Sequence, residues 1–279
     1  MLTSACHLSE VQPIRRLRSP RVTVQFPEVK AGDALRISAS TYVTFKRCPG
    51  QAGARLQGVY GPDSRPGFLG SLAHRIFSRH LTSGQIPSEE FVQACREEIG
   101  GSTLNNKLGG LELRPSALAS AIEEVRGLYE RFTRFPNEGF EGSELSIEVT
   151  PSEGVELVGT VDAVYREHLG GHRLVDWKTG ELGDPEDQLL FYALLWLLKR
   201  DELPAYVEAV SVRTGERFRA VPSTADVRRV MAELGELVDV IRSAWASGEE
   251  LPRTGGPWCR FCPLLEDCSE GKAAGVLLD

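Results

Sequence analysis

The sequence predicts an α/β protein in which a mixed central sheet is flanked by helices and carries a helical insertion. Between about residues 144 and 221, short apolar stretches alternate with period two and are separated by breaks that contain glycine, as β-strands are. Stretches with helical periodicity precede and follow them. The chain has 279 residues, of which 41% are hydrophobic, and is therefore long enough to bury a large core.

The pattern divides the chain into an N-terminal arm, residues 1–36, and one domain, residues 37–279. The arm lacks clear periodicity and contains four arginines, Arg15, Arg16, Arg18 and Arg21. They could contact a phosphate backbone, although an arm packed on the surface in solvent is the simpler interpretation. The domain is expected to contain, in order, a helical region, a core of strands, and a C-terminal helix with a cysteine tail, at about 70–135, 144–221 and 223–279.

Two helices are expected near the start of the domain. The first follows Ser40, a residue that caps helix N-termini, and ends at Pro49, which disfavours helical backbone in the residue before it. The second covers residues 70–81 and is amphipathic. His74 stands at the margin of its apolar stripe, where a histidine with no role beyond a satisfied border residue is common.

Two further helices complete the helical region. One covers residues 88–99 and places Cys95 in its buried stripe, where a cysteine acts as a small core residue. The other begins at Pro115 and runs to about residue 135. Glycines between them predict a loop at 100–113.

The strands that follow carry the first candidate functional residues. A first strand is expected at 144–149, where Glu148 could support a site, although an exposed glutamate is the simpler interpretation. Residues 155–165 and 174–178 read as two strands joined by a glycine-containing hairpin. The hairpin can bring Asp162 and Asp176 close together, and a bound divalent cation is the usual reason why neighbouring carboxylates are tolerated.

The end of the second of these strands places an acid beside a base. Asp176 and Lys178 are two residues apart and therefore project to the same face. A helix should follow from Asp184 and Pro185, as N-cap and first helical residue. Its residues Gln188 and Tyr192 are four apart and share one face. Beyond it, the sequence predicts a hairpin at 206–221 and a helix from about 223 to 245.

Three motifs follow one another in the core: Gly159-Thr160-Val161-Asp162, Asp176-Trp177-Lys178 and Gln188-x-x-x-Tyr192. In this order and spacing they resemble the PD-(D/E)XK nuclease superfamily, and specifically its RecB-like exonuclease branch. Four cysteines extend the resemblance, namely Cys48, Cys259, Cys262 and Cys268. Their arrangement is similar to that in the iron-sulfur members of the branch, which are AddB-type nuclease domains and CRISPR-associated exonucleases. The resemblance covers about residues 37–268. It implies a restriction-endonuclease-like core and a metal-dependent DNA exonuclease that acts on single strands or DNA ends in repair, recombination or defence.

The resemblance also implies a site. His74 stands in the family's Gly-x-x-x-His setting, so it would bind magnesium or manganese together with Asp162, Asp176 and the backbone carbonyl of Trp177. Lys178 would orient the attacking water or stabilise the transition state. Gln188 and Tyr192 would position the nucleic acid strand, with Tyr192 available to stack on a base.

Four cysteines can hold either a tetrahedral zinc ion or an iron-sulfur cluster. The resemblance implies a 4Fe-4S cluster with a structural role at Cys48, Cys259, Cys262 and Cys268, with zinc as the alternative. Such a centre would tie the first helix of the domain to the C-terminal tail and restrict the unfolded chain. Cys6 has no assigned role.

Charge and composition limit the remaining possibilities. The net charge of −7 disfavours unspecific coating of DNA, but an acidic enzyme can still bind nucleic acid through a locally basic or metal-loaded cleft. Residues 1–30 lack a signal-peptide pattern and the longest apolar run is too short for a membrane span, so we expect a cytoplasmic protein. A phosphate loop is absent, so a helicase or CRISPR adaptation partner would be a separate chain. The alternative function is a catalytically silent nucleic-acid-binding subunit of such a complex.

Overall fold

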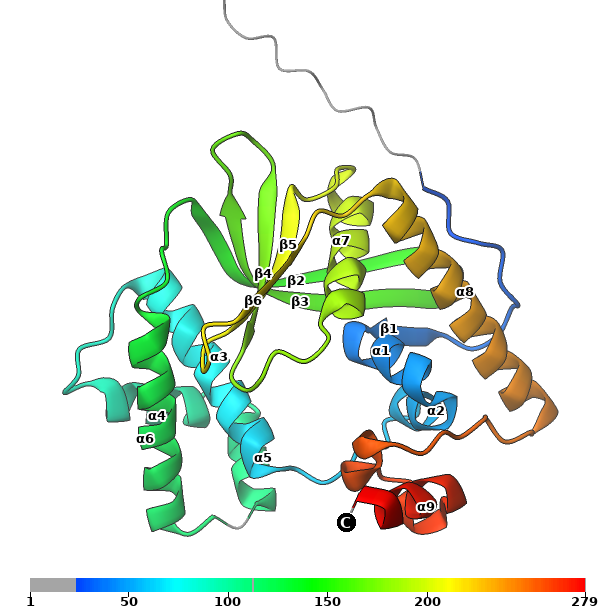
Figure 1. Ribbon diagram of the computed structural model, residues 1–279, viewed down its shortest axis with the longest axis horizontal. Helices are drawn as coiled ribbons and strands as arrows, with labels where there is room; N and C mark the ends of the chain where they lie inside the picture. Colours follow the sequence, from blue (N-terminus) through cyan, green and yellow to red (C-terminus); the bar gives the residue numbers. More distant parts are fainter. Residues whose placement is uncertain (1–23, 112, 279) are drawn as a thin grey trace, which may run out of the picture.

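A mixed sheet lies at the centre of the fold in this computed structural model, which describes residues 24–111 and 113–278 (Figure 1). The strand order among these residues is β1-β3-β4-β5-β6, and β2 pairs with β3 as well. The strands are β1 (Leu35–Ser38), β2 (Phe140–Ser152), β3 (Val155–Arg166), β4 (His172–Lys178), β5 (Tyr206–Ser211) and β6 (Arg217–Ala220). The pairs β1 with β3 and β4 with β5 are parallel and the others antiparallel, which confirms the predicted α/β class with a mixed sheet.

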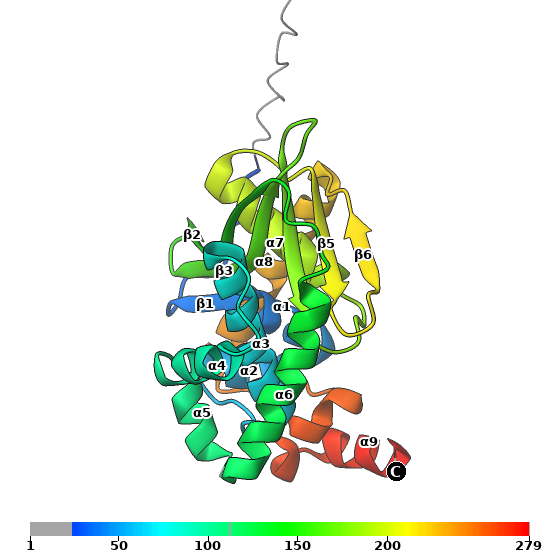
Figure 2. The same cartoon turned by 90° about the vertical axis from the view of Figure 1, so that its left-hand side faces the viewer.

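Helices cover both faces of this sheet. Those before β2 are α1 (Ala39–Arg47), α2 (Pro49–Leu56), α3 (Arg65–Ser83), α4 (Phe91–Gly100), α5 (Leu104–Gly110) and α6 (Pro115–Phe132). Those after β4 are α7 (Glu186–Arg200), α8 (Thr224–Ser247) and α9 (Ser269–Leu278). Helices α1, α7 and α8 pack on one face of the sheet and α3, α4 and α6 on the other. Figure 2 shows α3, α4, α5 and α6 close together in the lower half of the view. In the described residues, no helix combines the length and hydrophobicity that crossing a membrane requires.

Each face of the sheet has its own hydrophobic core. Successive side chains of a strand point to opposite faces, so Leu174 of β4 packs with α1, α7 and α8, whereas Val175 packs with α3, α4 and α6. The helix α7 is buried without a break from Leu189 to Leu197, because it lies between the sheet and α8. This burial fixes the helix that carries Gln188 and Tyr192 against the strands.

Three local features differ from the sequence-based prediction. Helix α1 is capped by Ser38, whose side chain accepts a hydrogen bond from Thr41 N–H, because the strand β1 runs directly into it. Pro49 does not end the helical region but begins α2, since Cys48 between the two helices is extended and proline is tolerated in a first helical turn. Helix α7 begins one residue later than predicted, at Glu186.

The predicted loop at 100–113 was wrong, because it contains α5. This seven-residue helix has two glycines and two asparagines and therefore a poor intrinsic helix propensity. Leu104, which is 1% exposed, anchors it in the core under α3. Tertiary burial thus decides its conformation.

The segment assigned to the arm is only partly within the described residues. The arginines Arg15, Arg16, Arg18 and Arg21 lie outside them. Of the remainder, Val24, Phe26 and Val29 pack against the core that contains α8, and β1 begins at Leu35.

Candidate active site

A gap in strand pairing at the middle of β3 creates the site. One edge of β3 is shared: β1 pairs with residues 155–158 and β4 pairs with residues 163–166. Among the described strands, none pairs with residues 159–162 on this edge. Asp162 therefore lies where β1 and β4 separate. Gly159 lets α7 approach here, since a Cβ at this position would lie 2.6 Å from the Leu195 side chain.

Asp162 connects β4 and α3. Its Oδ2 accepts a 2.6 Å hydrogen bond from the Trp177 N–H, and its Oδ1 lies 3.1 Å from Nδ1 of His74. The Trp177 carbonyl faces the same side as its N–H, since the next carbonyl, that of Lys178, accepts from Val212 on the opposite side. The structure therefore directs the Trp177 carbonyl toward the gap in which it was predicted to act.

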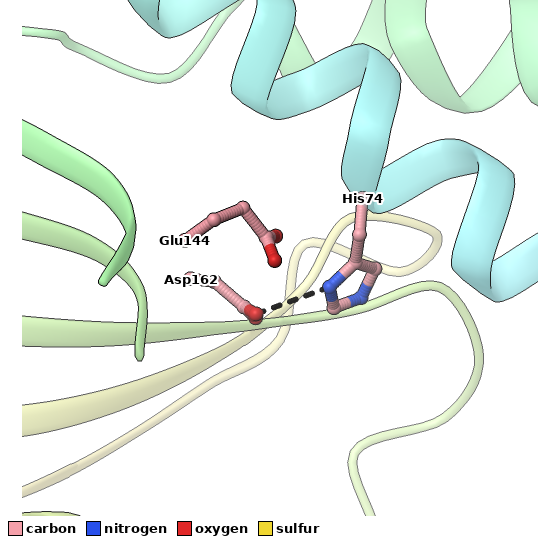
Figure 3. A group of neighbouring side chains, drawn as sticks. All are labelled: His74, Glu144 and Asp162. Atoms are coloured by element: carbon pink, nitrogen blue, oxygen red, sulfur yellow. Dashed lines mark hydrogen bonds and ion pairs between the residues drawn. The ribbon is translucent and has the colours of Figure 1, made fainter. Parts of the chain in front are cut away.

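A second carboxylate, Glu144, completes a group that the sequence reasoning missed. In the antiparallel register of β2 with β3, Glu144 stands opposite Asp162, between the pairs Ser143–Ala163 and Leu145–Val161. Ligand atoms of His74, Glu144 and Asp162 all lie within 4.8 Å of one another. Figure 3 shows the three side chains converging from α3, β2 and β3.

Glu144 also has an unusual backbone conformation. Its φ is 50°, in the left-handed region that residues other than glycine seldom adopt. Like charges directly across two strands are unfavourable as well. Backbone strain and charge repulsion at one position indicate a functional constraint, and a cation held between the carboxylates would relieve the repulsion. Glu148 is exposed and paired with Arg36, which agrees with the simpler interpretation of that glutamate.

The second half of the site is a hydrogen-bonded set on β4 and α7. Lys178 Nζ lies 2.8 Å from Asp176 Oδ2 and donates to Gln188 Oε1 at 2.8 Å. The Gln188 amide donates to Asp176 Oδ1 at 2.9 Å and contacts Tyr192 Oη at 3.0 Å. One glutamine therefore fixes the acid, the lysine and the phenol. The predicted i, i+2 and i, i+4 pairs come together as the strand and helix spacings require.

Burial and charge perturb the titration of these groups. Burial acts to lower the pKa of His74, but the neighbouring carboxylates, Asp162 foremost, raise it to about 9. Burial and the charge of Asp162 raise the pKa of Asp176 to about 6, against the lowering effect of Lys178. Partial desolvation and Asp162 likewise raise the pKa of Glu144, although this residue is exposed overall. The field at the gap is therefore negative and attracts cations.

The donors suit a hard divalent cation. Carboxylate oxygens with one imidazole, and a backbone carbonyl directed to the same gap, are ligands that magnesium or manganese accepts. Asp176 is not one of the three residues grouped within 4.8 Å, because Gln188 and Lys178 hold its carboxylate. Its Oδ2 is buried and forms the ion pair with Lys178 at 2.8 Å. A carboxylate oxygen has more than one lone pair, so Oδ2 can bind a cation as well as Lys178.

The cysteines form a separate cluster at the other end of the domain. The pKa of Cys262 is raised by burial and by the neighbouring thiols Cys259, Cys48 and Cys268, so the four predicted cysteines lie together. Helix α2 holds the tail beside Cys48, since Gly50 N–H donates to the Pro252 carbonyl at 2.9 Å. In Figure 1, α2 and the tail lie next to each other at the bottom of the molecule.

Glycines allow this close contact between α2 and the tail. A Cβ at Gly53 would lie 2.3 Å from the Leu251 side chain, and one at Gly61 would lie 2.2 Å from the Phe261 carbonyl oxygen. The glycine-rich sequence after Cys48 is thus what lets the tail approach. Cys95 lies elsewhere, fully buried on α4 as predicted, and Cys6 is outside the described residues.

Comparisons with known proteins place this geometry in a family. Two solved structures are similar over most of the chain. One is named "Putative exonuclease" from Eubacterium rectale, with 13% identity, 78% of this chain and 84% of that chain covered, and a TM-score of 0.49. The other is the protein SSO0001, with 13% identity, 86% and 88% covered, and a TM-score of 0.38. No curated protein matches the chain.

The sequence model of the PD-(D/E)XK nuclease superfamily matches residues 36–269, which include both halves of the site and all four clustered cysteines. The mixed sheet with helices on both faces agrees with the restriction-endonuclease-like core expected of that family. This chain belongs to the PD-(D/E)XK nuclease superfamily.

Proposed function

We propose that this protein is a metal-dependent nuclease that degrades DNA as an exonuclease, on single strands or from free ends. The observation that carries the proposal is the meeting of two sets of side chains at the gap in β3. One is the His74, Glu144 and Asp162 group, and the other is the Asp176–Lys178 ion pair. Its pathway would be DNA repair, recombination or defence, with a helicase or CRISPR adaptation protein as a separate partner.

The magnesium or manganese ion would be held by His74, Glu144, Asp162 and the Trp177 carbonyl. Asp176 Oδ2, which pairs with Lys178, would be a further ligand. A divalent cation supplies Lewis-acid stabilisation of phosphate charge and makes water more acidic. Lys178 is 28% exposed at its side chain and can reach a phosphate oxygen from solvent, where its charge would stabilise the transition state. The 2.8 Å hydrogen bond that it donates to Gln188 Oε1 would keep it oriented.

Tyr192 has a different role in this proposal from the one expected. The residue is only 8% exposed, and its hydroxyl accepts a hydrogen bond from the Gln188 amide. Little of the ring face is available for stacking on a base. Tyr192 therefore acts as a positioning residue that holds Gln188, and through it Asp176 and Lys178.

Cleavage should depend strictly on added divalent cation. With manganese or magnesium, we expect a linear single strand to be shortened from one end, which strands labelled at the 5′ or the 3′ end will identify by gel. Chelator should abolish shortening, since the carboxylates alone cannot stabilise the added negative charge of the transition state. A closed circular single strand should resist. Binding without cleavage under every metal condition would instead favour the silent binding subunit.

We further propose that the four clustered cysteines hold a 4Fe-4S cluster with a structural role. The proposal is supported by the proximity of the thiols, since Cys259, Cys48 and Cys268 all act on the pKa of Cys262. Four thiolates can hold such a cluster, and a tetrahedral zinc ion is the alternative that metal analysis distinguishes.

Replacing Cys268 with serine should remove most of the iron and acid-labile sulfide from anaerobically purified protein, because three thiolates hold such a cluster weakly. Iron, sulfide and zinc are measured per protein chain. Cys95→Ala is the matched control, since Cys95 is buried on α4 away from the cluster and its loss should leave the iron content unchanged. Stoichiometric zinc without iron in the parent protein would contradict the proposal.

A further inference from the structure

A pocket of about 320 Å³ adjoins the candidate active site. His74 and Glu144 form the wall that it shares with the metal-ligand group. The rest of the wall comes from α3 and α5, with Ser71, Arg75, Leu104 and Lys107. The pocket therefore extends the candidate site toward the helical region. Helix α5, which the sequence did not predict, forms part of its wall.

Two cations line this pocket, and neither forms an ion pair with a carboxylate of the described residues. Arg75 forms no hydrogen bond or ion pair with any described residue. Arg75 lines the pocket together with Glu144, and its charge acts to lower the pKa of that carboxyl. Lys107 donates only to the Ser71 hydroxyl, at 3.3 Å, and no carboxylate of the described chain pairs with it.

The neighbouring arginine on the same helix shows the contrast. Arg79, one turn after Arg75 on α3, pairs with Glu97 at 2.8 Å and lies 3.7 Å from Glu98. In a protein with 39 acidic residues, cations that line a pocket and lack a carboxylate are available for an external anion. A lysine, an arginine and a hydroxyl are the donors that bind phosphate.

We propose that Arg75, Lys107 and Ser71 bind a backbone phosphate of the nucleic acid strand, next to the phosphate that is cut. This inference rests on the proposed nuclease function and deepens it by assigning a path to the substrate, from the gap in β3 toward α5. The inference also assigns a role to α5, because this short helix places Lys107 opposite α3. Phosphate contacts carry no sequence information, so the subsite fixes the position of the strand without selecting bases.

The test is binding of a labelled oligothymidylate by fluorescence anisotropy in chelator, so that cleavage plays no part. Arg75→Gln and Lys107→Gln should each weaken binding roughly fivefold at 0.1 M salt and reduce the slope of log affinity against log salt by about 0.7, the effect of one lost phosphate contact on a single strand. Arg79→Gln, the same change on the same helix at a paired arginine, should bind like the parent protein.

Cleavage with manganese then separates this inference from the proposed function. The substrate is a single strand with one methylphosphonate beside the scissile position, which removes a single phosphate charge. This change should lower the cleavage rate of the parent enzyme. It should lower the rates of Arg75→Gln and Lys107→Gln less, because these variants already lack a contact to that phosphate. If the parent protein binds but does not cut, and the two variants bind more weakly, the subsite stands and the nuclease proposal fails. If the parent cuts, and both variants bind and cut like Arg79→Gln, the subsite is overturned while the nuclease proposal stands.

Discussion

Asp176→Asn is expected to reduce the rate of metal-dependent DNA cleavage by about a hundredfold to a thousandfold, the usual loss when one preorganised charged group is removed from a site. Asparagine keeps the shape of the side chain and can still accept from Gln188. It removes the negative charge that pairs with Lys178 at 2.8 Å and the oxygen best placed to assist a cation. Initial rates on an end-labelled single strand, at saturating manganese, measure the effect.

The same variant should fold at least as stably as the parent. Burial raises the pKa of Asp176 to about 6, above its ordinary value, so ionisation of this carboxyl costs the folded state stability as the pH rises through that range. A neutral amide avoids that cost at pH 8. Asp184→Asn, an exposed position just before α7, is the control that should leave cleavage unchanged. A fully active Asp176→Asn enzyme would remove the proposed mechanism.

Arg242→Met is expected to lower the free energy of unfolding by about 3–5 kcal/mol, because three backbone carbonyl groups would lose a charged hydrogen-bond donor. Arg242 of α8 is 5% exposed and donates to the backbone carbonyls of Lys30, Asp33 and Gly154. It therefore joins the segment before β1 to the turn between β2 and β3. Urea unfolding followed by circular dichroism measures the loss.

Arg229→Met on the same helix is the matched control for this prediction. Arg229 is 41% exposed at its side chain and pairs with Asp187 and Glu233, so its loss should change stability by no more than about 1 kcal/mol. Equal losses for the two variants would show that buried hydrogen bonds to carbonyls are not what makes Arg242 important.

The sequence predicted the parts of the fold in which periodicity and chemistry agree. β3, β4 and the hairpin between them follow from alternating apolar residues and Gly170–Gly171, and α8 follows from its apolar stripe. Most residues of the candidate site lie on these elements and on α7. Their convergence could be predicted because strand and helix spacing fix which side chains share a face.

The features that were missed depend on tertiary contacts. Glu144 and Glu148 are an even number of residues apart on β2, so strand periodicity does not distinguish them. Only the register with β3 places Glu144 opposite Asp162. Strand β1 pairs in parallel with β3, from more than a hundred residues away, so no local pattern reports it. Helix α5 forms against its own propensity because Leu104 is buried.

The positions of the cysteines along the chain also set an order of assembly during translation. Every residue of the candidate active site lies between His74 and Tyr192, whereas three of the four clustered cysteines follow the end of α8. Chains fold from the N-terminus as they leave the ribosome, so the sheet and its helices can form while Cys48 still lacks its partners. For the proposed 4Fe-4S cluster, insertion would then be the last step of assembly, and a shortage of iron would leave a folded sheet and helices with an undocked tail.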